Sequence, residues 1–366
     1  MYKTIVETFI NEKFKLELIF INDGSSDKTL GDTPSGVVES CMEFLRICRD
    51  EEFNNVVVSI KTSNTAMMVT TVRRLVRVMA EEGIAFPLHL GVTEAGDAED
   101  GRIKSAVGIG ALLADGIGDT VRVSLAESPE NEIPVAKELV DYVALRAAAP
   151  AIEGVAAPQF NYEEPVRRRT FGFGIIGGEN VPVVVGDEVE DKDIAPDIVA
   201  GLVPVVDLKN AKDSRFVAVT YSDLTPENIE RIKPLKDIVL VVSSQHVNAV
   251  GELRAIVHRL MTEGVEAPVI IRRAYNEDNI ETLRIKASAD LGVLLIDGLA
   301  DGLWIENPGI AATDLNALAF GILQATRARI SKTEYIACPG CGRTMYDLQG
   351  DVGRKITRRM FWKVQP

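Results

Sequence analysis

The chain contains the same sequence pattern twice, and this constrains its fold more than any other feature. RIKSAVGIGALLADGIGD (102–119) matches RIKASADLGVLLIDGLAD (284–301) at a shift of about 182 residues. Upstream of each segment, LVRVMAEEGIAFPLHLG (75–91) matches IVHRLMTEGVEAPVIIR (256–272), with a glycine and a proline at matching places. Similarity at a fixed shift is typical of a duplicated supersecondary unit. We therefore expect two copies of one structural unit.

Short β-branched runs alternate with amphipathic stretches through the first copy. NVVVSI (55–60) is typical of a buried strand, and the helical pattern that follows it ends at Gly83. Strands and helices alternate from there on, which predicts a parallel sheet. The expected strands are 55–60, 87–92 and 119–125, and the expected helices are 66–82, 104–115 and 129–146.

The predicted fold class is therefore α/β. A chain of 366 residues is long enough for a TIM-type (β/α) barrel with additions. We expect a partial barrel over residues 31–150 and a barrel-like unit over 151–330, the latter a degenerate repeat of 54–125. Residues 147–165, rich in alanine and proline, are typical of a linker between them.

Composition excludes several classes of partner. Hydrophobic residues make up 46% and charged residues 26%, as in a folded globular protein. A formal net charge of −14 argues against nucleic acid, which needs a basic surface. The sequence shows no signal peptide and no stretch of transmembrane length, and four cysteines are few for a disulfide framework. We therefore expect a cytoplasmic protein without a membrane partner, holding any anionic ligand by a few basic groups.

The two copies differ where barrel sites are built, at the strand ends and the loops that follow them. The first copy has Ser59, Lys61, Asn64, His89, Glu94, Arg122 and Ser124 at these places. The second copy has Val241, Ser243, His246, Ile270, Trp304 and Glu306. Lys286 remains opposite Lys104, but most of the polar set is gone. This difference indicates one functional copy and one structural copy.

Lys61, Lys104 and Arg122 are typical of a phosphate or diphosphate pocket, because lysine acts as a point charge and arginine as a bidentate fork. Glu94 follows a strand, where a proton donor or base would be placed. Taken singly, each is more often an ordinary residue of the barrel rim. Taken together, and mostly missing from the second copy, they favour a ligand site.

The histidines have structural explanations that are at least as good as functional ones. His89 alternates with leucines inside a strand, so a histidine satisfied within the barrel lumen is as good an interpretation as a catalytic one. His246 and His258 lie in the second copy and are expected to be structural.

Two other groups are also expected to be structural. Cys41 and Cys48 fall on one apolar helix face and fit buried small hydrophobic residues. The three arginines at 167–169 are typical of a solvated edge.

Cys338 and Cys341 stand in CPGCGRT, a Pro/Gly turn that would let both sulfurs reach one metal atom. A single CxxC is found in zinc sites, iron–sulfur sites and redox dithiols alike. No further cysteine follows, and the histidines are distant in sequence. The motif by itself favours half of a metal site, with a redox pair and a structural turn as alternatives.

Four segments together resemble one enzyme family. They are GDTPSGVVESCMEFLRICRD, NVVVSIKTSNTAMMV, PLHLGVTEAGDAEDGRIKSAVGIGALLADGIGDTVRVSL and EYIACPGCGRTMYDLQ. They resemble the (E)-4-hydroxy-3-methylbut-2-enyl diphosphate synthases of the non-mevalonate isoprenoid pathway, from about residue 31 to residue 349. The stretch over 151–330 resembles the insert of the large form, found in plants and Bacteroidetes.

The resemblance implies a reductive ring opening of 2-C-methyl-D-erythritol 2,4-cyclodiphosphate with loss of a hydroxyl group. It implies a [4Fe–4S] cluster as cofactor and ferredoxin or flavodoxin as electron donor. Glu94 would lie near the reacting carbon, and Cys338 and Cys341 would bind the cluster. The implied substrate-binding residues are Lys61, Asn64, Lys104, Arg122 and Ser124.

The chain departs from the family pattern near its end. The family has a third cysteine and a glutamate ligand well after CPxCGRT, whereas the 25 residues after Cys341 contain neither. Residues 331–366 are therefore expected to be a truncated iron–sulfur domain with only two cluster ligands. An inactive fragment of the synthase and a zinc-binding barrel scaffold are the alternative interpretations.

The beginning departs as well. LELIFINDGSSDKTL (16–30) resembles the nucleotide-sugar motif of family 2 glycosyltransferases, in which the aspartate matching Asp23 helps to hold the nucleotide. Residues 1–30 are therefore set apart as an atypical N-terminal segment from a chimeric junction, and a diverged synthase turn is the second interpretation. A homodimer is compatible with this organisation.

Overall fold

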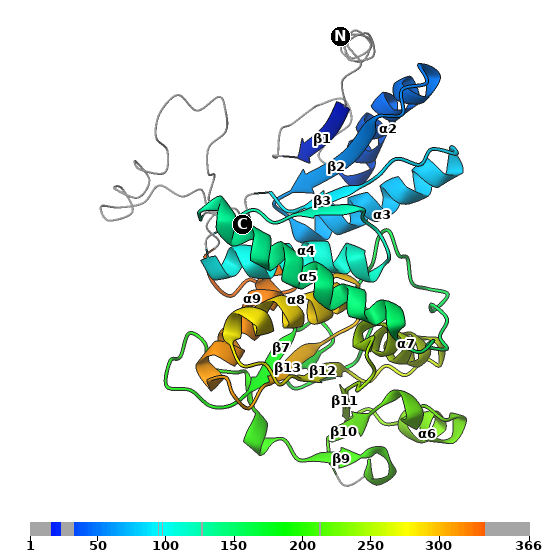
Figure 1. Ribbon diagram of the computed structural model, residues 1–366. Coiled ribbons are helices and arrows are strands. Elements are labelled where there is room, and N and C mark those ends of the chain that lie inside the picture. The colour runs from blue at the N-terminus through cyan, green and yellow to red at the C-terminus, as the bar shows by residue number, and fades with distance from the viewer. Residues whose placement is uncertain are drawn as a thin grey trace.

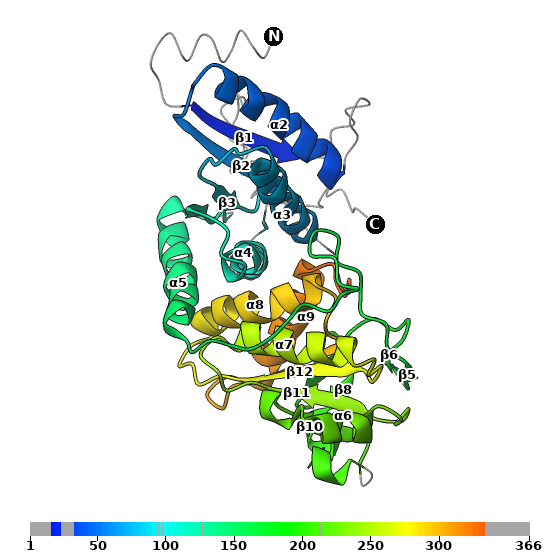
Figure 2. The ribbon, with the colours of Figure 1, turned by 90° about the vertical axis from the view of Figure 1, so that its right-hand side faces the viewer.

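The computed structural model describes residues 16–22, 33–93, 95–96, 98–125, 127–211 and 214–333. Two α/β units are stacked one above the other, and helices of both units lie between them (Figures 1 and 2). The first unit runs from β1 to α5 and the second from β5 to α9, so each contains one copy of the repeat. Within these ranges we find no helix with the length and apolar character that a membrane span requires.

The first unit contains four parallel strands. β1 (Leu16–Asn22) pairs with β2 (Val56–Thr62), and β3 (His89–Gly91) pairs with β4 (Thr120–Arg122). A single parallel bridge between β2 and β3 joins the two pairs, so the strands follow one another in chain order. This confirms the predicted parallel sheet, with the strands expected at 87–92 and 119–125 shorter than predicted. The segment set apart at the N-terminus contributes β1.

The helices of this unit begin at side-chain caps. Thr33 caps α2 (Pro34–Asp50), and Asn64 caps α3 (Thr65–Glu81) by accepting a hydrogen bond from the backbone N–H of Met67 at 3.1 Å. Gly83, at φ +67°, follows the end of α3 in a conformation that favours glycine. The remaining helices are α4 (Ala98–Ala114), which begins at residue 98 rather than 104, and α5 (Glu132–Ala144).

Cys41 and Cys48 both lie in α2 and are fully buried, as predicted. Burial, with a smaller contribution from Cys48, raises the pKa of the Cys41 thiol to about 12, so neither cysteine has the properties of a nucleophile.

The second unit is built on a seven-stranded sheet with the order β8-β7-β13-β12-β11-β10-β9, in which every pair is parallel. Its strands are β7 (Val183–Gly186), β8 (Ile198–Val199), β9 (Val205–Asp207), β10 (Phe216–Val219), β11 (Val239–Val242), β12 (Val269–Ala274) and β13 (Gly302–Glu306). Its helices are α6 (Pro226–Ile232), α7 (Ala249–Thr262), α8 (Ile280–Ile296) and α9 (Ala312–Ala325). A short antiparallel hairpin, β5 (Gly172–Phe173) and β6 (Ile176–Gly177), precedes the sheet.

The two copies of the repeat pack against each other through equivalent helices, α4 and α8. A Cβ on Gly110 would lie 2.9 Å from the Cβ of Ala289, and one on Gly292 would lie 2.8 Å from Cγ2 of Val107. Gly110 matches Gly292 in the repeat, and Val107 matches Ala289. The same contact therefore occurs twice, related by an approximate two-fold axis, and it needs glycine because no side chain fits between the helices.

Ion pairs at the helix ends repeat in the same way. Arg102 Nε lies 3.1 Å from Glu281, and Arg284 Nη2 lies 3.1 Å from Glu99. Arg102 matches Arg284, and Glu99 matches Glu281. Each arginine reaches across to the acid of the other copy, so the two units are joined by a self-complementary interface like that of a symmetric dimer.

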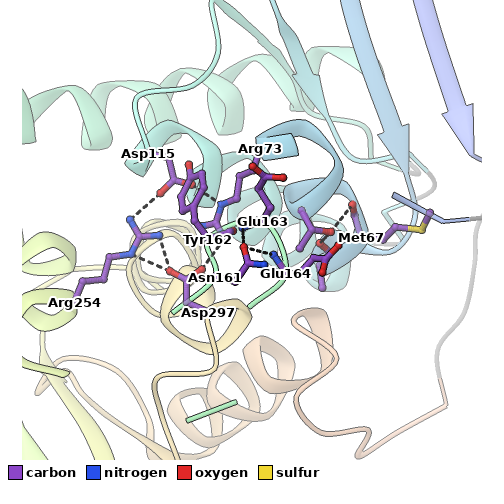
Figure 3. A network of polar contacts seen from close by, with 11 residues as sticks. Met67, Arg73, Asp115, Asn161, Tyr162, Glu163, Glu164, Arg254 and Asp297 are labelled. Atoms are coloured by element: carbon purple, nitrogen blue, oxygen red, sulfur yellow. Dashed lines mark hydrogen bonds and ion pairs between the residues drawn. The ribbon is translucent and has the colours of Figure 1, made fainter. Parts of the chain in front are cut away.

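A buried cluster of two arginines and two aspartates lies in this interface (Figure 3). Arg73 contacts Asp115 at 2.9 Å and Asp297 at 2.7 Å, and Arg254 contacts the same two carboxylates at 2.8 and 2.7 Å. The two arginines occupy equivalent positions, as do the two aspartates. Burial opposes the charge on Arg73, but the two carboxylates outweigh it and raise the pKa of its guanidinium.

Residues 147–165, expected to form a linker, are held against both units. The guanidinium of Arg73 lies 4.3 Å from the centre of the Tyr162 ring, and Arg74 contacts Glu164 at 2.8 Å (Figure 3). On the second unit, the backbone N–H of Ala157 points to Nδ1 of His258 at 3.4 Å. The connection is therefore a strap that contributes to the interface.

Candidate functional site

The carboxyl ends of β2, β3 and β4 bring two cationic side chains together. Gly91 pairs with Arg122 in the β3–β4 register, and the β2–β3 bridge puts Lys61 at the same level. The Cε atom of Lys61 lies 3.2 Å from the place where a Cβ on Gly91 would be, and Cβ of Arg122 lies 3.8 Å from that place. The absent side chain of Gly91 thus leaves the space across which Lys61 extends toward Arg122.

Lys61 points to the face of the sheet opposite the helices. Val58 and Ile60 belong to the apolar core, so alternation along β2 directs Ser59 and Lys61 to the other face, which lines the lumen in a barrel. Lys61 is only 2% exposed. Burial of an ammonium group is unfavourable unless polar or anionic groups surround it, and an anionic ligand would supply such charge.

A second polar row lies one step below the row of Lys61 and Arg122. The hydroxyl of Ser59 donates to the carbonyl oxygen of His89 at 2.8 Å, and Nδ1 of His89 lies 2.8 Å from Oγ1 of Thr120. His89 is therefore a lumen residue with defined partners. Sequence analysis did not identify Thr120, although its pairing with a lumen histidine could have been found from the strand register.

The other predicted ligand residues surround these rows with varying support. Asn64 uses its side-chain oxygen as the cap of α3, which gives it a structural role whether or not it meets a ligand. Ser124 is half-buried just after β4, and Lys104 is buried on α4 at 5% exposure. Their contact with a ligand remains a prediction.

Three predicted residues lie outside the described part of the chain: Glu94, Cys338 and Cys341. Within the part that is described, no group of three or more His, Cys, Asp or Glu side chains could hold a metal ion. The predictions for Glu94 and for the two cysteines are therefore not tested by these coordinates.

The second unit has an apolar interior where the first has polar rows. Val241 stands in place of Ser59, Ile270 in place of His89, and Trp304 in place of Arg122. All three belong to one apolar cluster with Ile176, Val183, Val185 and Val239. The face of this sheet away from the core helices is therefore filled with hydrophobic side chains and offers no polar lumen.

The cations that remain at the strand ends of the second unit are paired internally. Arg272, which stands in place of Gly91, makes a bidentate contact with Glu306 at 2.9 Å for both bonds and stacks on Trp304 at 4.5 Å. Lys286, the counterpart of Lys104, contacts Glu277 at 2.8 Å. These carboxylates neutralise the charge that an anion would need, which fits a structural role for this copy.

The three arginines at 167–169 do not form a solvated edge as predicted. Arg167 contacts Asp301 at 2.6 Å, and Arg168 is buried and donates to the carbonyl oxygen of Ala267 at 2.9 Å. Burial lowers the pKa of Arg168 to about 10, and only Arg169 is exposed. The prediction is thus wrong for two of the three, because these residues fasten the strap to the end of the second repeat.

Comparison with known proteins agrees with this division of roles. The family model described as the GcpE TIM-barrel domain matches residues 2–137, which include the strands of the first unit and most of the segment set apart at the N-terminus.

Curated relatives match almost the whole chain. The 4-hydroxy-3-methylbut-2-en-1-yl diphosphate synthase (flavodoxin) of Phocaeicola vulgatus is 49% identical over 92% of this chain and 62% of its own length. The Bacteroides thetaiotaomicron protein of that name has the same figures, and the chloroplastic ferredoxin enzyme of Oryza sativa is 33% identical over 90% of this chain and 56% of its own length. The chain spans about 60% of the length of these relatives. It belongs to the 4-hydroxy-3-methylbut-2-en-1-yl diphosphate synthase family, in the large form that these bacterial and plant proteins represent.

Proposed function

We propose that the first unit binds the diphosphate of 2-C-methyl-D-erythritol 2,4-cyclodiphosphate in the synthase reaction, which opens the ring reductively and removes a hydroxyl group. The observation that carries this proposal is the row of Lys61, Gly91 and Arg122 at the carboxyl ends of three parallel strands. The second unit lacks a comparable row and has paired its remaining cations. An anion would therefore bind to the first copy alone.

The two cations of this row would act differently. Lys61, buried on the lumen face, would place a compact charge beside the phosphoryl oxygens. Arg122 is exposed at the end of β4, so its planar guanidinium is accessible for a bidentate contact with the same group. Asn64, Lys104 and Ser124 would complete the diphosphate contacts.

Glu94, two residues beyond Val92 at the end of β3, would lie near the reacting carbon and could hold or deliver a proton there. This assignment rests on the resemblance of VTEAG to the family motif.

The proposal includes a [4Fe–4S] cluster, for which residues 331–366 would supply Cys338 and Cys341. Two thiolates separated by two residues are the donors that such a cluster takes, so the residues present fit it as part of a ligand set. When bound, the cluster would supply electrons and a Lewis-acidic iron. Relatives are named for flavodoxin or ferredoxin, and a donor of this kind would serve here.

Anaerobic reconstitution with iron and sulfide tests the cluster assignment. We expect the Cys338→Ala variant to bind less iron and sulfide per chain than the wild type, because it removes one of the two thiolates of the motif. Cys48→Ala, in a buried helix position, is the control and should leave both contents unchanged. Zinc without sulfide would identify a zinc-binding scaffold instead, and no metal at all would identify an inactive fragment.

Titration calorimetry with the cyclic diphosphate tests the binding site. We expect Arg122→Ala to weaken binding about 10- to 100-fold, since hydrogen bonds to charged groups are worth about 1.5–3 kcal/mol. Arg272→Ala is the matched control, an arginine at a strand end of the second unit that is already paired with Glu306. Equal losses in both variants, or no binding by the wild type, would contradict the proposed site.

A further inference from the structure

His89 and its partners form a polar level of the lumen that the proposed function has not used. Two residues along a strand span about 6.6 Å, so this level lies about that far below the row of Lys61 and Arg122. The His89 ring is partly exposed, and Thr120 holds its Nδ1 at 2.8 Å. Nδ1 and Nε2 lie on opposite sides of the ring, so this contact directs Nε2 away from Thr120.

The fold does not require polar residues at this level. In the second unit the equivalent positions are Val241, Ile270 and Gly302, and the first two pack into an apolar cluster. Ile270 and Gly302 pair in the same register as His89 and Thr120. One repeat thus shows that the unit folds with a dry interior, and the other keeps polar groups that are unfavourable to bury without a partner. The polar level is therefore better explained by a ligand than by packing.

We propose that His89 is a ligand-binding residue, which donates a hydrogen bond from Nε2 to a phosphoryl oxygen at the floor of the site. Thr120 is its positioning residue: by donating its hydroxyl hydrogen to Nδ1, it fixes the neutral tautomer that carries the proton on Nε2. The site then has two cations above and one directional, uncharged donor below. This inference rests on the proposed diphosphate site and adds its lower boundary.

The imidazole NMR spectrum tests this inference directly, because the chain contains only three histidines. In the full chain labelled with ¹⁵N-histidine, both the cyclic diphosphate and inorganic pyrophosphate should shift the Nε2 signal of His89, assigned with the His89→Gln variant. His246 and His258 are internal controls in the second unit and should not move. Their Nδ1 atoms already face backbone N–H groups, of Asn248 and Ala157.

Affinity measurements provide the second arm. His89→Leu should weaken pyrophosphate binding about 10-fold, the loss expected for a hydrogen bond to a charged group. His89→Gln, whose amide can donate from near the position of Nε2, should recover most of this loss. Thr120→Val should lower the affinity less than His89→Leu and should alter the tautomer signal of His89.

The two proposals fail in different ways. If pyrophosphate binds and depends on Arg122, but the His89 signal does not shift and His89→Leu binds normally, the floor contact is wrong and the diphosphate site stands. If pyrophosphate does not bind at all, the diphosphate site itself is wrong, and the role of His89 fails with it.

Discussion

Replacement of Asp297 by alanine is expected to lower the free energy of unfolding by about 3–5 kcal/mol, the cost of removing one partner from a buried ion pair. Asp297 is 1% exposed and accepts from both Arg73 and Arg254, which are 0% and 18% exposed. Without it, Asp115 alone would face two guanidinium groups inside the interface between the units. Urea unfolding followed by circular dichroism measures the change.

An exposed pair on α5 provides the control. Lys137 and Asp141 form an i, i+4 contact with side chains 73% and 61% exposed, so Asp141→Ala should change stability by less than about 0.5 kcal/mol. A loss below about 1 kcal/mol for Asp297→Ala would mean that the cluster does not hold the units together. A second transition appearing in that variant would show that the two units unfold separately once the cluster is broken.

Replacement of Lys61 by methionine is expected to weaken binding of the cyclic diphosphate about 10- to 100-fold, again the range for a hydrogen bond to a charged group. Methionine keeps most of the length of the side chain and removes the charge. Because Lys61 is almost completely buried, the variant should unfold at the same urea concentration as the wild type or at a higher one. Calorimetry and urea unfolding on the same preparation separate the two effects.

A steric variant tests the same geometry without removing any charge. A Cβ on Gly91 would lie 3.0 Å from the carbonyl oxygen of Arg122 and 3.2 Å from Cε of Lys61, so Gly91→Ala should displace the lysine and weaken binding. Gly201→Ala is the control, since a Cβ there would meet nothing within 4 Å. Normal binding by Lys61→Met and Gly91→Ala together would place the anion elsewhere.

Much of this arrangement follows from the sequence. The repeat predicted two units, and the loss of polar residues from the second copy predicted which unit has the polar lumen. Strand order and the helix caps follow from local rules, as the Asn64 cap of α3 illustrates. Cys41 and Cys48 were assigned to the core from their spacing alone, because residues seven apart share one face of a helix.

The contacts between the copies could not be predicted in the same way. Asp115 and Asp297 look like ordinary C-terminal helix residues in the sequence, yet each serves the arginine of the other copy. The arginines at 167–169 resemble a surface run because nothing local reveals that carbonyl oxygens of the second repeat lie within reach of Arg168. Long-range partners depend on how the units dock, and a periodic pattern does not contain that information.

The packing of α4 on α8 has a consequence for synthesis of the chain. The two helices are separated by about 180 residues, and almost every face of α8 is buried. At a translation rate of roughly 5–20 residues per second, α4 leaves the ribosome roughly 10–40 s before its partner exists. During that interval the apolar surface around Gly110 is exposed to other nascent chains. The first unit can acquire its final packing only after the last repeat has emerged, so chaperones that cover apolar surface should affect the yield of this protein more than its final stability.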